Sequence, residues 1–150
     1  MNAYPDTSFL FSLYVPQAHS IRATAHFAAM TEPLYLTSLS RFELTNAIQL
    51  AVFRKTVPRK AASLALEKLD ANISGGALVV VPCDWAAVHS RAIKISLQHT
   101  DKGGHRGFDI LHVATALELG AKEFLTFDMQ QIALAKAVGL KGMRITRTDG

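Results

Sequence analysis

Cysteine is nearly absent from this sequence: among 150 residues, Cys83 is the only one. A single cysteine excludes an intramolecular disulfide and a zinc site built from paired cysteines. We therefore expect a reducing, cytoplasmic setting, in which Cys83 packs against its neighbours.

Long apolar runs are missing as well. The run FLFSLYV (9–15) is far shorter than the roughly 20 residues that a membrane-spanning helix needs. Because this run follows Asp6 and no basic residue precedes it, we expect neither a signal peptide nor a membrane association.

Two motif classes are also absent. The six histidines form no H-E-x-x-H motif and no pair four residues apart, which argues against a zinc hydrolase. The glycine pairs at 75–76 and 103–104 lack the lysine–serine continuation of a P-loop, which argues against a nucleotide site of that kind.

The remaining composition is that of a compact domain with a basic surface. Hydrophobic residues make up 49% of the chain and charged residues 19%, and the net charge is +4. Cations gather in RKTVPRK (54–60) and KGGHR (102–106), where phosphate binding and an ordinary basic surface are both adequate explanations. The candidate RNA-binding residues are Arg54, Lys55, Arg59, Lys60, Lys102 and Arg106.

Short β-rich runs alternate with helical periodicity along the whole chain. We expect strands at 2–5, 33–37, 77–82, 123–127 and 142–145. We expect helices at 7–14, 19–30, 40–55, 58–74, 84–99, 108–119 and 128–138, with a loop at 100–107. Strands separated by helices pair in parallel, so the fold class is α/β: one domain (1–150) forming a three-layer α/β/α sandwich around a central parallel sheet.

Four acids fall just after an expected strand or near the start of an expected helix: Asp6, Glu43, Asp109 and Asp128. Each has a structural explanation of its own. Asp6 can cap a helix, Ser40–Glu43 and Asp128–Gln131 fit capping boxes, and Asp109 can favour the positive end of a helix dipole. Asp84 is a comparable cap, and for it we keep that interpretation.

Taken together, the four acids indicate more than four separate helix caps. In a parallel sheet the carboxyl ends of the strands meet at one edge, so these carboxylates are expected to face one cleft. Clustered carboxylates repel, and they must bind protons or share a cation. Oxygen ligands favour Mg²⁺ or Mn²⁺, and such ions handle phosphodiester oxygens and activate water, which predicts a metal-dependent nuclease or phosphatase.

Several neighbouring residues are candidates for supporting roles. Ser8, Asn46 and Thr126 can orient carboxylates or water, whereas Thr7 is better explained as a turn residue. His112 follows Asp109 by one helical turn, and we interpret it as a buried or edge histidine rather than a catalytic one. Phenylalanines at helical positions are interpreted as core or subunit interface, not as base-stacking platforms; they are Phe9, Phe11, Phe42 and Phe53.

Three segments resemble the PIN-domain ribonucleases, most closely the VapC-type toxins of toxin–antitoxin pairs. They are PDTSFL (5–10), SRFELTNA (40–47) and FDILHVATALELGAKEFLTFDMQQIALAKAVGL (108–140). The resemblance implies a Mg²⁺- or Mn²⁺-dependent endoribonuclease that cuts single-stranded loops of tRNA or rRNA. It implies an acidic pocket of Asp6, Glu43, Asp109 and Asp128, of which Glu43 binds the metal directly or through water.

The same resemblance implies a homodimer and a small DNA-binding antitoxin that inserts a segment into the active site. One departure is Pro5, where the family usually has an aliphatic residue, and we expect the first strand to be shortened there. Two other functions remain open: a catalytically silent PIN-like module that binds RNA or protein, and a metal-dependent phosphatase acting on small phosphoesters.

Overall fold

The computed structural model describes residues 1–144, and the side chains up to Gly142. Ile145 of the last expected strand, and the end of the expected 1–150 domain, lie outside that range. The strands are β1 (Ala3–Pro5), β2 (Leu34–Leu36), β3 (Leu78–Val80), β4 (Glu123–Thr126) and β5 (Lys141–Arg144). The helices are α1 (Thr7–Tyr14), α2 (Ser20–Ala28), α3 (Ser38–Phe53), α4 (Arg59–Ser74), α5 (Trp85–Gly103), α6 (Gly107–Glu118) and α7 (Met129–Ala137).

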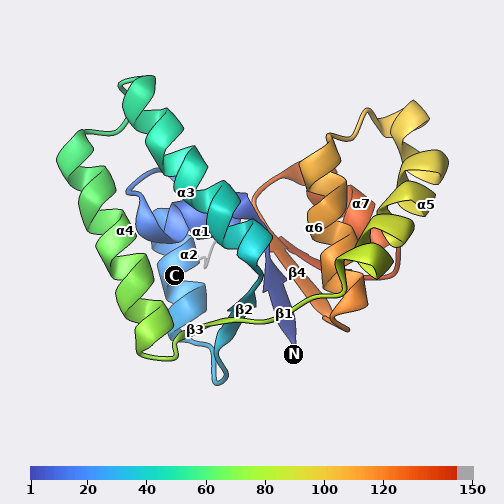
Figure 1. Cartoon of the computed structure of the whole chain (residues 1–150), viewed down its shortest axis with the longest axis horizontal. Coiled ribbons are helices and arrows are strands. Elements are labelled where there is room, and N and C mark those ends of the chain that lie inside the picture. Colours follow the sequence, from blue (N-terminus) through green and yellow to red (C-terminus); the bar gives the residue numbers. More distant parts are fainter. Residues whose placement is uncertain (145–150) are drawn as a thin grey trace.

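The strands pair in parallel, as expected, but they form two hydrogen-bonded sheets. One sheet has the order β1-β4-β5 and the other contains β2 and β3, while β1 lies next to β2 (Figure 1). The N–H of Asp6 donates to the carbonyl of Leu125 in β4 (3.0 Å). Because alternate residues of a strand turn their N–H groups to opposite neighbours, the nitrogen of Pro5 faces β2 and has no hydrogen to donate. The sheet is therefore interrupted where Pro5 lacks its donor.

Strand β1 is three residues long and ends at Pro5, where the sequence led us to expect a short first strand. Pro5 itself still pairs in register with Leu125 of β4. A proline removes a donor on one side of a strand only, and the pairing on the other side is unaffected.

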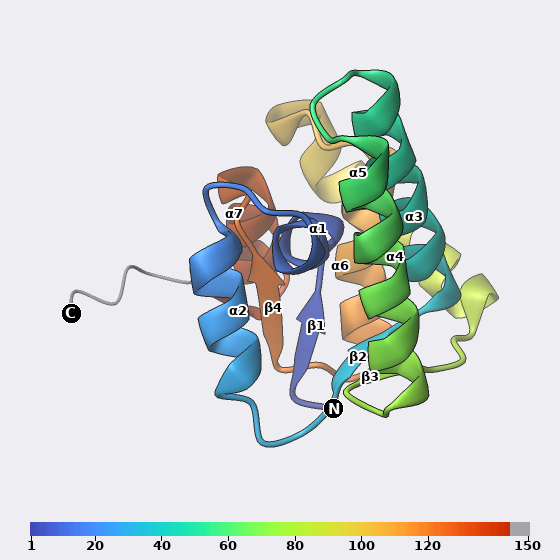
Figure 2. The ribbon, with the colours of Figure 1, turned by 90° about the vertical axis from the view of Figure 1, so that its left-hand side faces the viewer.

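Helices cover both faces of the paired strands, which confirms the three-layer α/β/α class (Figure 2). The side chains of Ala3 and Leu125 join a core built by α1 to α4, whereas Tyr4 and Phe124 join a second core with α5, α6 and α7. This alternation is what strands buried on both faces require. Cys83 packs against the second core, as expected. No helix in residues 1–144 is long and apolar enough to cross a membrane.

Two helix boundaries differ from the sequence expectation. Helix α3 begins at Ser38 with Thr37 as its N-cap, so Ser40 and Glu43 do not form the predicted capping box. Helix α5 continues through the first half of the predicted 100–107 loop and ends at Gly103, where Gly104 adopts the left-handed conformation (φ 64°) that glycine tolerates. The predicted loop is thereby reduced to three residues.

Among the phenylalanines, the core interpretation holds for Phe9, which is fully buried, and for Phe11, which packs against the core. Phe42 and Phe53 are instead 62% and 81% exposed. Both lie on α3, and their exposure excludes the core interpretation for them.

Candidate active site

The carboxyl ends of β1 and β4 lie side by side, and Asp6 and Asp128 follow them in the sequence. Both are helix N-caps: Asp6 accepts the N–H of Phe9, and Asp128 accepts the N–H of Gln130. The predicted Asp128–Gln131 capping box is wrong, because the amide of Gln131 instead donates to the Asp109 carbonyl (3.2 Å). The remaining acids come from helices, Glu43 from α3 and Asp109 from the first turn of α6.

Asp6 is the most buried of the four acids, with 4% of its surface exposed. Its Oδ1 accepts hydrogen bonds from the Ser8 hydroxyl (2.6 Å) and the Phe9 N–H (3.0 Å), and its Oδ2 accepts one from the Thr126 hydroxyl. Burial raises the pKa of Asp6, although these donors oppose the shift. The carboxylate is thus held in one orientation on the floor of the site.

Glu43 is held by a second group of hydrogen bonds. Its Oε1 accepts from the Thr7 hydroxyl and from Nε2 of His112 (3.0 Å). Nδ1 of the same imidazole bonds to the hydroxyl of Tyr4 (2.9 Å), which also bonds to Ser40 (3.0 Å). Desolvation acts to raise the pKa of Glu43, but the His112 hydrogen bond and charge and the Thr7 hydrogen bond outweigh it, and the net pKa is lowered.

Asp109 joins the acidic group through the charges around it. Desolvation raises the pKa of Asp109, and repulsion from Asp128 and, more weakly, Glu43 adds to this, while His112 and Arg106 oppose it. Asp128 itself is exposed at the rim. The Asp109 carboxylate is thus within electrostatic reach of both Asp128 and Glu43.

This donor set suits a hard divalent cation in its chemistry. All four acids offer oxygen ligands, and a cation would relieve the repulsion that raises the pKa of Asp109. Within the described residues, however, no three Asp, Glu, His or Cys side chains stand close enough together to hold one ion. A ligand shell drawn from three of these acids therefore requires rotation of side chains, for which the exposed Asp128 has the most freedom.

The predicted supporting residues divide into two groups. Ser8 and Thr126 belong to the network, since both donate to Asp6, and the Thr126 hydroxyl also accepts the N–H of Asp128 (3.0 Å). Asn46 lies on the exposed surface of α3. The preferred interpretation of Thr7 as a simple turn residue is wrong, because its hydroxyl binds Glu43.

The candidate cations surround two turns, both at the upper edge of the molecule in Figure 1. Arg54 and Lys55 follow α3, and Arg59 and Lys60 open α4. Lys102 lies in the last turn of α5, and Arg106 caps α6 next to the acids.

His112 and Tyr4 are the residues whose roles at the site the sequence did not reveal. His112 is buried as expected (1% exposed), yet it is the group that links Glu43 to the core. Its spacing of three residues from both Asp109 and Thr115 on an apolar helix was a usable signal. A tyrosine in a short apolar strand gives no such signal, because core packing explains it fully.

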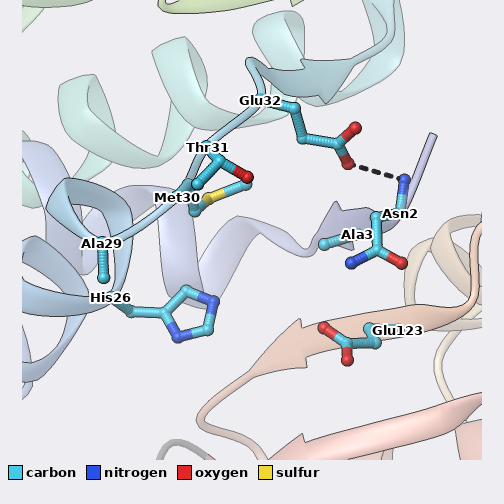
Figure 3. Close-up of a pocket in the computed structure, with 8 residues that line it drawn as sticks. All are labelled: Asn2, Ala3, His26, Ala29, Met30, Thr31, Glu32 and Glu123. Carbon is cyan, nitrogen blue, oxygen red and sulfur yellow. Dashed lines mark hydrogen bonds between the residues drawn. The ribbon is translucent and has the colours of Figure 1, made fainter.

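A separate pocket opens at the amino ends of β1 and β4, at the opposite edge of the sheet from the acids (Figure 3). Glu123 and the ring of His26 face it, and Glu32 accepts the backbone N–H of Asn2 (2.9 Å). The pocket contains none of the predicted site residues.

Comparisons with known proteins agree with this architecture. Three solved structures are similar over nearly the whole chain. VapC20 of Mycobacterium tuberculosis, described as a toxin that cleaves the sarcin–ricin loop, is 17% identical with a TM-score of 0.67, covering 93% of this chain and 98% of its own. FitAcB of Neisseria gonorrhoeae is 19% identical with a TM-score of 0.68, covering 95% of this chain and 97% of its own. PAE2754 of Pyrobaculum aerophilum is 20% identical with a TM-score of 0.62, covering 95% of this chain and 89% of its own.

Identity at this level establishes a shared fold and no more. No curated protein matches the chain. The sequence model of the PIN domain, in contrast, matches residues 3–137, which include all four acids and both networks that hold them. The protein therefore belongs to the PIN domain family.

Proposed function

We propose that this protein is a Mg²⁺- or Mn²⁺-dependent endoribonuclease that acts as the toxin of a VapC-type toxin–antitoxin pair. The observation that supports the proposal is that Asp6 and Asp128 follow the paired strands β1 and β4, while Asp109 is repelled by both Asp128 and Glu43. A protein keeps so costly a group of like charges where a cation or a phosphate group has to be handled.

Each acid has a role that its environment supports. Asp6, Asp109 and Asp128 would hold the metal, and Glu43 would hold it directly or through water. When bound, the metal would neutralise charge on the phosphodiester and lower the pKa of water. His112 and Thr7 fix the Glu43 carboxylate and keep it ionised at neutral pH, while Ser8 and Thr126 orient Asp6.

The choice of RNA as substrate rests on weaker support. PIN-domain proteins include VapC20, whose description names an RNA loop as its target. The cations of the α3–α4 and α5–α6 turns suit a polyanion better than a small phosphoester. We propose Arg54, Lys55, Arg59, Lys60, Lys102 and Arg106 as phosphate contacts.

A cognate antitoxin and a second copy of the chain are the proposed protein partners. Several large apolar side chains are well exposed, among them Phe42 (62%), Phe53 (81%) and Leu97 (78%). Exposed apolar groups on this scale are typical of surfaces that associate with another protein.

Incubation with tRNA or with an rRNA loop fragment tests the activity directly. We expect discrete cleavage products with Mg²⁺ or Mn²⁺ and none in excess chelator, because the ion that would neutralise the phosphodiester and activate water is then removed. Products at the same rate in chelator would contradict the proposal. Hydrolysis of a small aryl phosphate but not of RNA would favour the phosphatase, and metal-independent RNA binding without cleavage would favour the silent module.

A further inference from the structure

A groove runs from the acidic site along α1 toward the start of α2. Its walls include Ser8 and Asp128 from the acidic site, Phe11 of α1, Gln17 and His19 from the α1–α2 connection, and Phe127 after β4. The wall of the groove is mostly apolar and opens to solvent, but two of its residues, Ser8 and Asp128, also belong to the acidic site. A molecule bound at the acids would therefore extend into this groove.

The groove carries a stacked pair of rings. The imidazole of His19 lies face to face on the ring of Phe127, with centroids 4.4 Å apart and planes 5° from parallel. Phe9, fully buried, supports Phe127 from the core at 6.0 Å and 15°. The Arg22 guanidinium lies 5.4 Å from the Phe127 centroid and donates to Nδ1 of His19. The orientation of His19 is thus fixed from two directions.

A fixed planar ring at the wall of an open groove is suited to another planar ring. Unpaired RNA bases stack on aromatic side chains, histidine and arginine planes, because each base offers a flat π face whatever its identity. Gln17 stands in the same wall with an amide that can donate to and accept from a base edge. The polar side chains of this wall, Gln17 and His19 among them, suit a nucleotide better than an apolar peptide.

We propose that this groove is a nucleobase subsite, in which one unpaired base of the RNA substrate stacks on the His19–Phe127 pair beside the phosphodiester held at the acids. The inference rests on the proposed endoribonuclease function and adds where the substrate strand lies. Phe11, which packs against the core, also lines this groove.

Binding of a single-stranded oligoribonucleotide that contains 2-aminopurine tests the subsite without cleavage, since excess chelator is present. Stacking quenches 2-aminopurine fluorescence. We expect His19→Ala to weaken binding by about tenfold to a hundredfold and to abolish the quenching, as loss of one base–ring stack does in other proteins. His19→Phe keeps a ring at the position and should retain both signals.

Phe127→Leu provides an independent variant, because leucine keeps apolar contact with the core while removing the ring that supports His19. It should weaken binding in the same direction. The matched control is His89→Ala on α5, at an exposed position outside the groove. It should not change affinity by more than about twofold, since it removes no stack.

Equal affinity and quenching in His19→Ala and the unmodified chain would overturn the subsite, as would absence of oligonucleotide binding. The proposed nuclease activity fails separately, through absence of cleavage in Mg²⁺ despite intact quenching. If both hold, His19→Ala should raise KM for RNA cleavage far more than it lowers kcat. A fall in kcat at unchanged KM would contradict a stacking role.

Discussion

Asp109→Asn is expected to lower RNA cleavage by at least about 100-fold while raising the unfolding temperature at neutral pH. The substitution keeps the shape of the side chain and removes a charge that would be needed to bind the metal. In the metal-free protein the ionised carboxylate of Asp109 lowers stability at neutral pH, because desolvation and repulsion from Asp128 raise its pKa. The gain in stability should be about 0.5–1 kcal/mol, or about 1–4 °C in a chain of this size.

The pH dependence of stability has a definite sign. The pKa of Asp109 is raised in the folded protein above the ordinary value of 3.8, so the folded state binds its proton more tightly than the unfolded state does. Its contribution to stability is therefore complete below pH 3.8 and declines as pH rises through the higher folded pKa. Asp109→Asn removes this decline, and the difference in unfolding temperature between variant and parent should grow as pH rises across that window.

Thermal unfolding followed by circular dichroism at several pH values, without metal and with Mg²⁺, measures both effects. Mg²⁺ should stabilise the parent chain and stabilise Asp109→Asn much less. Asp101→Asn on α5 is the matched control, because it removes an exposed carboxylate elsewhere. Full cleavage by Asp109→Asn, or equal stabilisation of it by Mg²⁺, would remove Asp109 from the site.

His112→Ala is expected to destabilise the fold by about 3 kcal/mol, which lowers the unfolding temperature by roughly 6–12 °C. The imidazole is 1% exposed and bonds to both Tyr4 and Glu43. Its removal leaves a cavity and deprives both partners of a hydrogen bond. The hydroxyl of Tyr4 keeps its bond to Ser40, which limits the loss.

The same substitution should raise the pKa of Glu43. Desolvation then outweighs the one remaining donor, Thr7, whose hydroxyl alone continues to favour the ionised form. A carboxylate with a lowered pKa adds stability that is lost as pH falls through the folded pKa, so His112→Ala should also weaken the acid-induced loss of stability.

His112→Gln separates positioning from packing, because its amide can still donate to Glu43. Cleavage should be partly restored in it relative to His112→Ala, and the pH profile of cleavage should move back toward the parent. His89→Ala, at an exposed position on α5, is the control. A stability loss below about 1 kcal/mol in His112→Ala would show that the buried network contributes little.

The fold class, and the positions of the acids relative to strands and helices, could be predicted because they depend on local pattern. The alternation of strands and helices determines a parallel arrangement, and Asp6 and Asp128 follow strands that pair. What could not be predicted depends on contacts between distant segments. Thr37 rather than Ser40 caps α3, and Tyr4 reaches His112 across 108 positions, because the packing of β1 against α3 and α6 selects those partners.

The relative positions of the acids in space could not be predicted either, because they also depend on contacts between distant segments. Each acid has a sound explanation as a cap or a dipole partner, and three of the four do occupy the first turn or the N-cap of a helix. Glu43 lies one turn further into α3 than the capping box required, which places it against His112 rather than at the helix end.

The missing N–H donor of Pro5 affects how rigidly β1 and β2, and the acids that follow them, are held relative to each other. A continuous backbone ladder would set the separation of β1 and β2 rigidly, and with it the separation of Asp6 from the helix that carries Glu43. Here that separation depends on side chains: Tyr4 with Ser40, and Thr7 and His112 with Glu43. Asp6 and Glu43 thus stand on two sides of a contact without a backbone ladder, and an ion or substrate bound between them would be able to change the width of the site without breaking a backbone hydrogen bond.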